Sequence, residues 1–195
     1  MPDTTTRLRV DATPTAPALL LRPWSAADAA GLVALGSDEA LRRWTSFAVE
    51  DETSAARWLR EQRQGWEQGS RFAFAVEEVD ASGISGTGGP PAAHVVLKNV
   101  VPGAASAEVG YWTAARARGR GIAPRAVRAL TDWTFATFTR AGLARLELLH
   151  QVDNTASCRV AEKNGYELTA VLPPLPPAFP REGHLHVRHL TETSG

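Results

Sequence analysis

Residues 108–127, which read EVGYWTAARARGRGIAPRAV, constrain the fold of this chain more than any other segment. A strand-like run leads into a turn rich in Gly and Arg, and the turn leads into a helix with Pro124 in its first turn. Proline is tolerated there because the N–H that it lacks would have no partner in the helix. A glycine-rich turn that opens a helix presents backbone N–H groups at the positive end of the helix dipole, where phosphate oxygens bind well. The segment predicts a strand–turn–helix unit with an anion site.

The charge around this turn is uneven, although the chain as a whole is neutral. The 195 residues include 21 Lys+Arg and 21 Asp+Glu, so the overall balance gives no argument for a nucleic-acid-binding protein. Residues 109–131 nevertheless hold five Arg and no acid. They are Arg116, Arg118, Arg120, Arg125 and Arg128. A ligand with several phosphates is the expected partner.

The periodicity of the remaining chain predicts helices and strands in mixed order. The predicted helices are 26–35, 38–44, 53–68, 122–140 and 154–164, and the predicted strands are 18–22, 71–76, 94–101, 107–113, 143–151, 166–172 and 184–191. Residues 81–91 are predicted to be a flexible hairpin loop. This order indicates an α/β or α+β fold with a mixed sheet. Residues 1–16, rich in Thr, Pro and Asp, are expected to be a flexible leader, and residues 17–192 one domain.

Other classes of protein are excluded by what the sequence lacks. A single cysteine, Cys158, excludes a disulfide framework and a zinc site built from several cysteines. No apolar run approaches the roughly 18 residues of a membrane span, and the N-terminus has no apolar signal core. A cytoplasmic protein without a membrane partner is therefore expected.

Cys158 is predicted to be a buried structural residue, the usual environment of a free cysteine. The alternative is an acyl-cysteine intermediate, with His150 or the group His184, His186 and His189 as its partner. The spacing of these histidines gives little indication of metal ligands, so no metal is expected.

The turn fits neither common nucleotide template. A Walker loop needs a Lys-Ser/Thr pair, and a Rossmann fingerprint needs a third glycine. Residues 118–123, RGRGIA, instead resemble the acyl-CoA signature Gln/Arg-x-x-Gly-x-Gly/Ala of the GNAT acyltransferases. The blocks at 108–112, EVGYW, and 153–166, DNTASCRVAEKNGY, resemble the branch of ribosomal-protein acetyltransferases of the RimJ/RimL type. The resemblance extends from about Leu19 to Leu190.

The resemblance implies a fold and an activity. The GNAT fold is a central mixed, mostly antiparallel twisted sheet flanked by helices, with strands that splay apart at the acyl-CoA site. The implied enzyme is an acyl-CoA-dependent N-acetyltransferase that uses acetyl-CoA or another acyl-CoA and no metal, and that acts as a monomer or homodimer. Its acceptor is a primary amine on a protein N-terminus, an amino acid or a small metabolite, acylated by direct attack in a ternary complex. The alternative is a non-catalytic acyl-CoA-binding or regulatory module.

The resemblance also implies candidate catalytic residues. Glu108 is the candidate base, and a surface carboxylate explains it equally well. Many GNAT enzymes use a Tyr on the last helix as the acid, but the matching position here is Ala161. Ser157 is therefore the candidate proton donor, with a role in starting the helix as its alternative.

Binding residues follow from the same resemblance. Trp44 and Phe47, with Glu108 and the loop 173–180, are expected to line the acceptor pocket. The residues expected to bind acyl-CoA are Val109, Tyr111, Trp112, Thr113, Arg116, Arg118, Gly119, Arg120, Gly121, Ile122, Ala123, Asn154 and Ser157.

Overall fold

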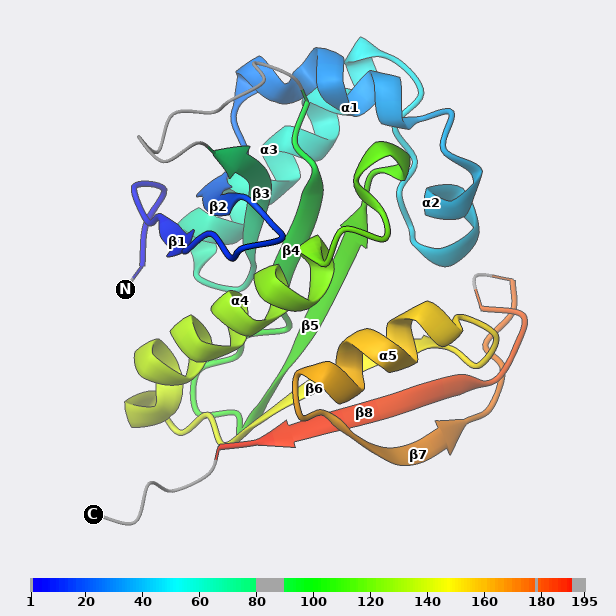
Figure 1. Cartoon of the computed structure of the whole chain (residues 1–195). Helices are drawn as coiled ribbons and strands as arrows, with labels where there is room; N and C mark the ends of the chain where they lie inside the picture. The colour runs from blue at the N-terminus through cyan, green and yellow to red at the C-terminus, as the bar shows by residue number, and fades with distance from the viewer. Residues whose placement is uncertain (1, 80–89, 178, 191–195) are drawn as a thin grey trace.

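The computed structural model describes residues 2–79, 90–177 and 179–190 (Figure 1). Eight strands form one sheet in the order β1-β2-β3-β4-β5-β6-β8-β7. Among the described residues only the β5–β6 pair is parallel. The strands are β1 Leu8–Val10, β2 Ala18–Pro23, β3 Phe72–Val79, β4 Ala93–Lys98, β5 Ser106–Thr113, β6 Arg145–Gln151, β7 Glu167–Leu172 and β8 Gly183–His189. The predicted mixed, mostly antiparallel sheet is confirmed.

Helices cover both faces of the sheet (Figure 1). The α-helices are α1 Ala29–Leu35, α2 Glu39–Trp44, α3 Glu52–Gln68, α4 Ile122–Phe138 and α5 Thr155–Lys163. On one face α1 and α3 pack against each other, and on the other α4 and α5 lie together. No helix among the described residues has the length and apolar character needed to cross a membrane.

Strand β3 shows how the sequence divides the core into two layers. Its side chains alternate between the faces, as the two-residue period of a strand requires. Phe72 and Phe74 belong to the cluster that packs on α4, whereas Ala73 and Ala75 belong to the cluster formed with α1 and α3. All four are fully buried, so this strand is covered from both sides.

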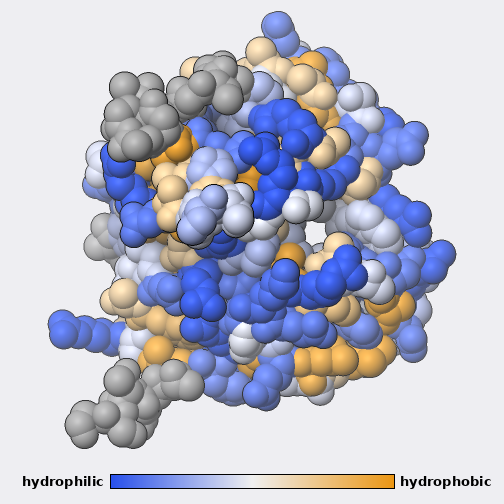
Figure 2. All heavy atoms as spheres, viewed as in Figure 1, coloured by the Kyte–Doolittle hydropathy of each residue, from blue (hydrophilic) through white to orange (hydrophobic). Residues whose placement is uncertain are grey.

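The sheet opens between β5 and β6. Their parallel pairing joins residues 106–109 to 145–148 and ends at Val109 and Leu148. Beyond that point β5 stays paired with β4 as far as Thr113, and β6 stays paired with β8 as far as Gln151. The expected splay is therefore confirmed, and the edge of residues 110–113 that faces β6 has no strand partner among the described residues. The space-filling view shows an opening at this place, between α2 and α5 (Figure 2).

The predicted elements are observed, with differences at their ends. The strand predicted over 94–101 ends at Lys98, because Asn99 adopts a left-handed conformation with φ of 59°. Residues 81–89 of the predicted loop lie outside the described residues. At the N-terminus, residues 8–10, which composition assigns to a flexible leader, form β1 and pair with β2. Arg125 of α4 also donates hydrogen bonds to the carbonyls of Asp11 and Pro17, a long-range contact that composition does not reveal.

Candidate active site

The glycine-rich turn adopts the conformation that its sequence predicts. Gly119 has φ of 75° and Gly121 has φ of 73°, in the left-handed region that favours glycine. Gly121 is the N-cap of the 17-residue helix α4. Apart from the glycine itself and its two chain neighbours, no heavy atom of the described residues lies within 4 Å of where a side chain at either glycine would begin. The backbone at the positive end of α4 is thus open to an anion.

A cleft of about 420 Å³ runs from this turn along the splayed strands to α5. It contains most of the residues predicted to bind acyl-CoA. Those that line it are Val109, Tyr111, Trp112, Thr113, Arg118, Gly119, Gly121, Ile122, Ala123, Asn154 and Ser157. We call this hollow the turn-side cleft.

The cations around the turn-side cleft differ from those the sequence predicts. Of the three arginines expected to bind phosphate, Arg118 alone lines the cleft within the described part of the chain. Arg116 donates to the carbonyl of Pro90, and Arg120 pairs with Glu78 at 2.7 Å. Their side chains are held by groups outside the cleft.

Helix α5 supplies two further cations to the turn-side cleft, Arg159 and Lys163. Sequence reasoning missed both as ligand contacts. Both lie in the block 153–166 that carries the family resemblance, but only the packing of α5 along the cleft brings them toward the turn.

Arg118 also ties the turn to α2. Its Nε donates to the carbonyl of Thr113 at 3.1 Å, and its guanidinium pairs with Asp38. The Asp38 carboxylate accepts from the backbone N–H of Ala115 at 3.2 Å and from N–H groups in the first turn of α2. One carboxylate therefore connects the α2 wall to the glycine-rich turn.

A second cleft, of about 460 Å³, meets the turn-side cleft at the splay. The predicted pocket residues Trp44, Phe47 and Glu108 line it, as do Leu175 and Phe179 of the proline-rich loop. Both clefts share Trp44, Thr45, Gly110, Tyr111, Trp112, Leu149 and His150. We call the second hollow the acceptor-side cleft, after the acceptor pocket that the sequence predicts for Trp44, Phe47 and Glu108. It reaches the same stretch of β5 from the α1–α3 side of the sheet.

Ser157 and Tyr111 meet across the splay. Tyr111 of β5 donates its hydroxyl hydrogen to Ser157 Oγ at 2.9 Å. Asn154 caps α5 by accepting from the backbone N–H of Ser157 at 3.2 Å, so the serine side chain is left free for Tyr111. Burial raises the pKa of Tyr111 to about 12, which keeps its hydroxyl protonated at neutral pH.

Glu108 lies on the acceptor-side cleft and is held by two neighbours. Lys98 Nζ is 2.6 Å from one carboxylate oxygen, and Asn99 Nδ2 donates to the other at 3.0 Å. Because side chains alternate along β5, Glu108 points to the opposite face of the sheet from Tyr111. The two candidate catalytic residues, Glu108 and Ser157, therefore approach the splay from different sides.

A match to a family model identifies the family of this chain. The model of the acetyltransferase (GNAT) domain matches residues 18–167. The chain belongs to the GNAT family. It is therefore an acyl-CoA-dependent acetyltransferase by family, consistent with a glycine turn and an open sheet edge that meet in one cleft. No curated protein matches the sequence significantly.

Solved structures share the fold of this GNAT enzyme. RimJ of Mycobacterium smegmatis in complex with CoA-disulfide is 24% identical, with a TM-score of 0.77 over 97% of this chain and 88% of that one. RimL, a ribosomal L7/L12 α-N-protein acetyltransferase in complex with coenzyme A, is 17% identical, with a TM-score of 0.76 over 93% and 98%. The ribosomal-protein-S5-alanine acetyltransferase of Vibrio fischeri is 18% identical, with a TM-score of 0.74 over 91% and 96%.

The acceptor-side cleft of this GNAT enzyme also contains a buried histidine that sequence reasoning missed. His94 of β4 stacks on Trp112, with ring centroids 5.4 Å apart, and its Nδ1 accepts from Trp24 Nε1 at 3.0 Å. Burial, assisted by the positive charges of Arg71 and Lys98, holds the pKa of His94 well below its ordinary value of 6.5. His94 is neutral at pH 7 and lines the acceptor-side cleft together with the ring of Trp112.

Proposed function

We propose that this GNAT enzyme transfers an acetyl group from acetyl-CoA to a primary amine by direct attack in a ternary complex. The observation that carries the proposal is the meeting of the two clefts at the splay between β5 and β6. A donor in the turn-side cleft and an acceptor in the acceptor-side cleft could meet there, where the two clefts share lining residues. Bringing both reactants together in this way supplies much of the rate enhancement of such enzymes.

The chain offers suitable groups for acetyl-CoA. Backbone N–H groups at the start of α4, with Arg118, Arg159 and Lys163, would hold the phosphates. The unpaired edge of residues 110–113 would bind the amide groups of the pantetheine arm as an added strand does. The bound thioester supplies the electrophilic carbonyl.

In this mechanism the proton of the attacking amine is removed on one side of the sheet, and the proton for the leaving thiolate is supplied from the other side. The attacking amine must be neutral, and the Glu108 carboxylate is the group on the acceptor side that would receive its proton through water. Ser157 Oγ, which accepts from Tyr111, would donate its own proton to the leaving thiolate and be resupplied by the tyrosine, which would regain its proton from solvent. This arrangement replaces the family's helix tyrosine, whose position holds Ala161.

The acceptor-side cleft favours an amine on an uncharged, partly apolar chain end. Its aromatic wall includes Trp44, Phe47 and Trp112, and cations at Arg71, Lys98 and Arg181 line it beside the single acid Glu108 among the described residues. A polycationic acceptor would meet repulsion there. Two proteins of similar fold are described as a ribosomal L7/L12 α-N-protein acetyltransferase and as an acetyltransferase that modifies the N-terminal serine of L7/L12, which supports an N-terminal peptide as the first acceptor to test.

The test is release of CoA thiol from acetyl-CoA with a panel of acceptors. The panel holds short peptides that begin with Ser or Ala, the same peptides with a blocked N-terminus, free amino acids and polyamines. We expect release with unblocked peptides and intersecting double-reciprocal plots, as a ternary complex requires. Tight CoA binding without release above the uncatalysed rate for any amine would indicate the non-catalytic module instead.

A further inference from the structure

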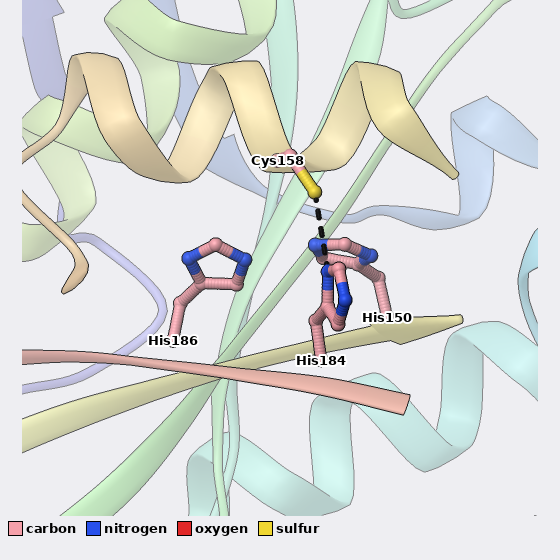
Figure 3. Close-up of side chains that lie close together, drawn as sticks. All are labelled: His150, Cys158, His184 and His186. Atoms are coloured by element: carbon pink, nitrogen blue, oxygen red, sulfur yellow. Dashed lines mark hydrogen bonds between the residues drawn. The ribbon is translucent and has the colours of Figure 1, made fainter. Parts of the chain in front are cut away.

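Four side chains with metal-binding atoms converge between α5 and the sheet (Figure 3). His150 comes from β6, His184 and His186 from β8, and Cys158 from α5. One ligand atom from each lies within 4.8 Å of the others. We call these four residues the His3Cys cluster.

The strand register explains the cluster. His150 and His184 are directly paired across β6 and β8. His186 is two residues beyond His184, so it lies on the same face of the sheet. The ring centroid of His150 is 5.4 Å from that of His184 and 5.1 Å from that of His186. Helix α5 covers this face and points Cys158 toward the rings, with Sγ 3.3 Å from His184 Nδ1 (Figure 3).

Hydrogen bonds fix the tautomers of two rings. His150 Nδ1 is 2.8 Å from the carbonyl oxygen of Gln151, and His186 Nδ1 is 3.3 Å from that of Tyr166. A carbonyl can only accept, so both Nδ1 atoms carry hydrogen and both Nε2 atoms present a lone pair. These two Nε2 atoms are buried, with no hydrogen-bond partner among the described residues. Buried polar atoms without partners are rare and call for a missing ion or water.

This pattern is typical of histidines that bind a metal, which usually donate the second ring N–H to a backbone carbonyl. Three imidazoles and one thiolate form a ligand set suited to Zn²⁺ in tetrahedral geometry. Zinc–ligand bonds of about 2.0–2.3 Å place tetrahedral ligands roughly 3.3–3.7 Å apart. The cluster needs only a small contraction from its present span to reach that geometry.

We propose that the His3Cys cluster binds one Zn²⁺ ion as a closed structural site. On binding, the Cys158 thiol gives its proton to solvent, and the site gains one positive charge from the ion and the thiolate together. The ion joins α5 to β6 and β8. It thereby fixes the helix turn that carries Ser157 and the strand end whose His150 lines both clefts. The sequence names His150, His184 and His186 only as possible partners of Cys158, and the register of β6 and β8 brings the three rings together beneath α5.

The proposal is tested by metal titration of the untagged full chain after removal of metal by chelation. We expect one equivalent of Zn²⁺ to bind with a Kd below about 10⁻⁶ M in competition with a chromophoric chelator. Co²⁺ should give the intense visible bands of a tetrahedral site and a thiolate charge-transfer band. Zn²⁺ should also raise the Tm of the metal-free protein.

Matched variants separate this site from adventitious binding. Cys158→Ser and His184→Ala alter half-buried ligands, and His189→Ala alters an exposed histidine on the same strand. Cys158→Ser should abolish the charge-transfer band, and both ligand variants should weaken Zn²⁺ binding at least about 10-fold, whereas His189→Ala should behave as the wild type. A wild-type Kd above about 10⁻⁶ M, or equal binding by all three variants, would overturn the proposal. Metal binding does not depend on the proposed acetyl transfer, so the two can fail separately.

Discussion

The hydroxyl of Tyr111 donates to Ser157 Oγ across the gap where β5 leaves β6, at 2.9 Å. Tyr111 belongs to the strand that borders the gap, and Ser157 to the first turn of α5. Because burial raises the pKa of Tyr111 to about 12, the pair holds a proton beside the turn-side cleft throughout the neutral range. In the proposed mechanism, Tyr111 would replace the proton that Ser157 donates.

Removal of this pair should slow catalysis more than it weakens CoA binding. We expect Ser157→Ala to lower kcat about 10²-fold and Tyr111→Phe about 10-fold, because the serine hydroxyl remains in the second variant. The double variant should be no slower than Ser157→Ala, since both act through one proton path. Steady-state kinetics and CoA titration measure the two effects.

Tyr166→Phe is the control for this pair. Tyr166 is also buried, has a pKa raised to about 12 by burial, and is hydrogen-bonded to Thr131 at 2.6 Å. Its loss should reduce the free energy of unfolding by about 1 kcal/mol without changing kcat. Unchanged kcat in Ser157→Ala would instead assign Ser157 to the start of α5 alone.

Substitution of Glu108 should lower kcat/KM for the amine and leave the affinity for CoA unchanged. Glu108→Gln keeps the shape of the side chain but removes its ability to take a proton, so kcat/KM for the amine should fall about 10²-fold. The control is Glu147→Gln, whose carboxylate lies on the paired position of β6 and bonds to Arg145. Equal effects of both changes would contradict a role for Glu108 as the base.

The turn glycines allow backbone strain to be separated from ligand binding. Gly121→Ala forces a side chain into the left-handed region and should cost about 1–2 kcal/mol of stability, with weaker CoA binding as well. Gly103→Ala introduces the same strain at φ of 79° in an exposed loop. Its loss of stability should be similar and its CoA affinity unchanged. Denaturant unfolding and calorimetric CoA titration distinguish the two, and equal CoA affinity in both variants would count against a phosphate site at this turn.

The arginines should differ in their contribution to CoA affinity. Arg118 lines the turn-side cleft, so Arg118→Ala should raise the Kd for CoA about 10-fold or more, as expected for a hydrogen bond to a charged group. Arg125 instead holds the N-terminal segment through Asp11 and Pro17. Arg125→Ala should leave the Kd unchanged while lowering stability. A larger rise in the Kd for CoA in Arg125→Ala than in Arg118→Ala would contradict the assignment of Arg118 to the phosphate site.

His94 should make the fold sensitive to acid. Its pKa is well below 6.5 in the folded chain, so below about pH 6.5 the unfolded chain binds a proton that the folded chain does not. The free energy of unfolding should therefore fall as pH drops below 6.5, by up to about 1.4 kcal/mol per pH unit from this group, and be independent of it above that pH. Urea unfolding of wild type, His94→Gln and the exposed control His189→Gln between pH 5 and 8 tests this. An identical pH slope for wild type and His94→Gln would contradict it.

Local patterns predicted the parts of this enzyme that depend on neighbours in the chain. The strand, the glycine-rich turn and α4 follow from periodicity, from Gly121 at the N-cap and from the tolerance of Pro124 in a first turn. The family resemblance predicted the splay and 11 of the 25 residues that line the turn-side cleft. These properties depend on backbone conformation, which short stretches of sequence strongly restrict.

Tertiary packing decided what depends on partners far away in the chain. Three arginines near the turn have similar sequence surroundings, yet Asp38, Glu78 and the carbonyl of Pro90 direct them differently. Residues 8–10 have the composition of a leader and become a strand because β2 offers an open edge. The His3Cys cluster exists because the register of β6 and β8 aligns three rings beneath α5. Sequence determined which backbone units this protein builds, and the fold alone decided which side chains meet, since contact depends on distances that spacing along the chain does not encode.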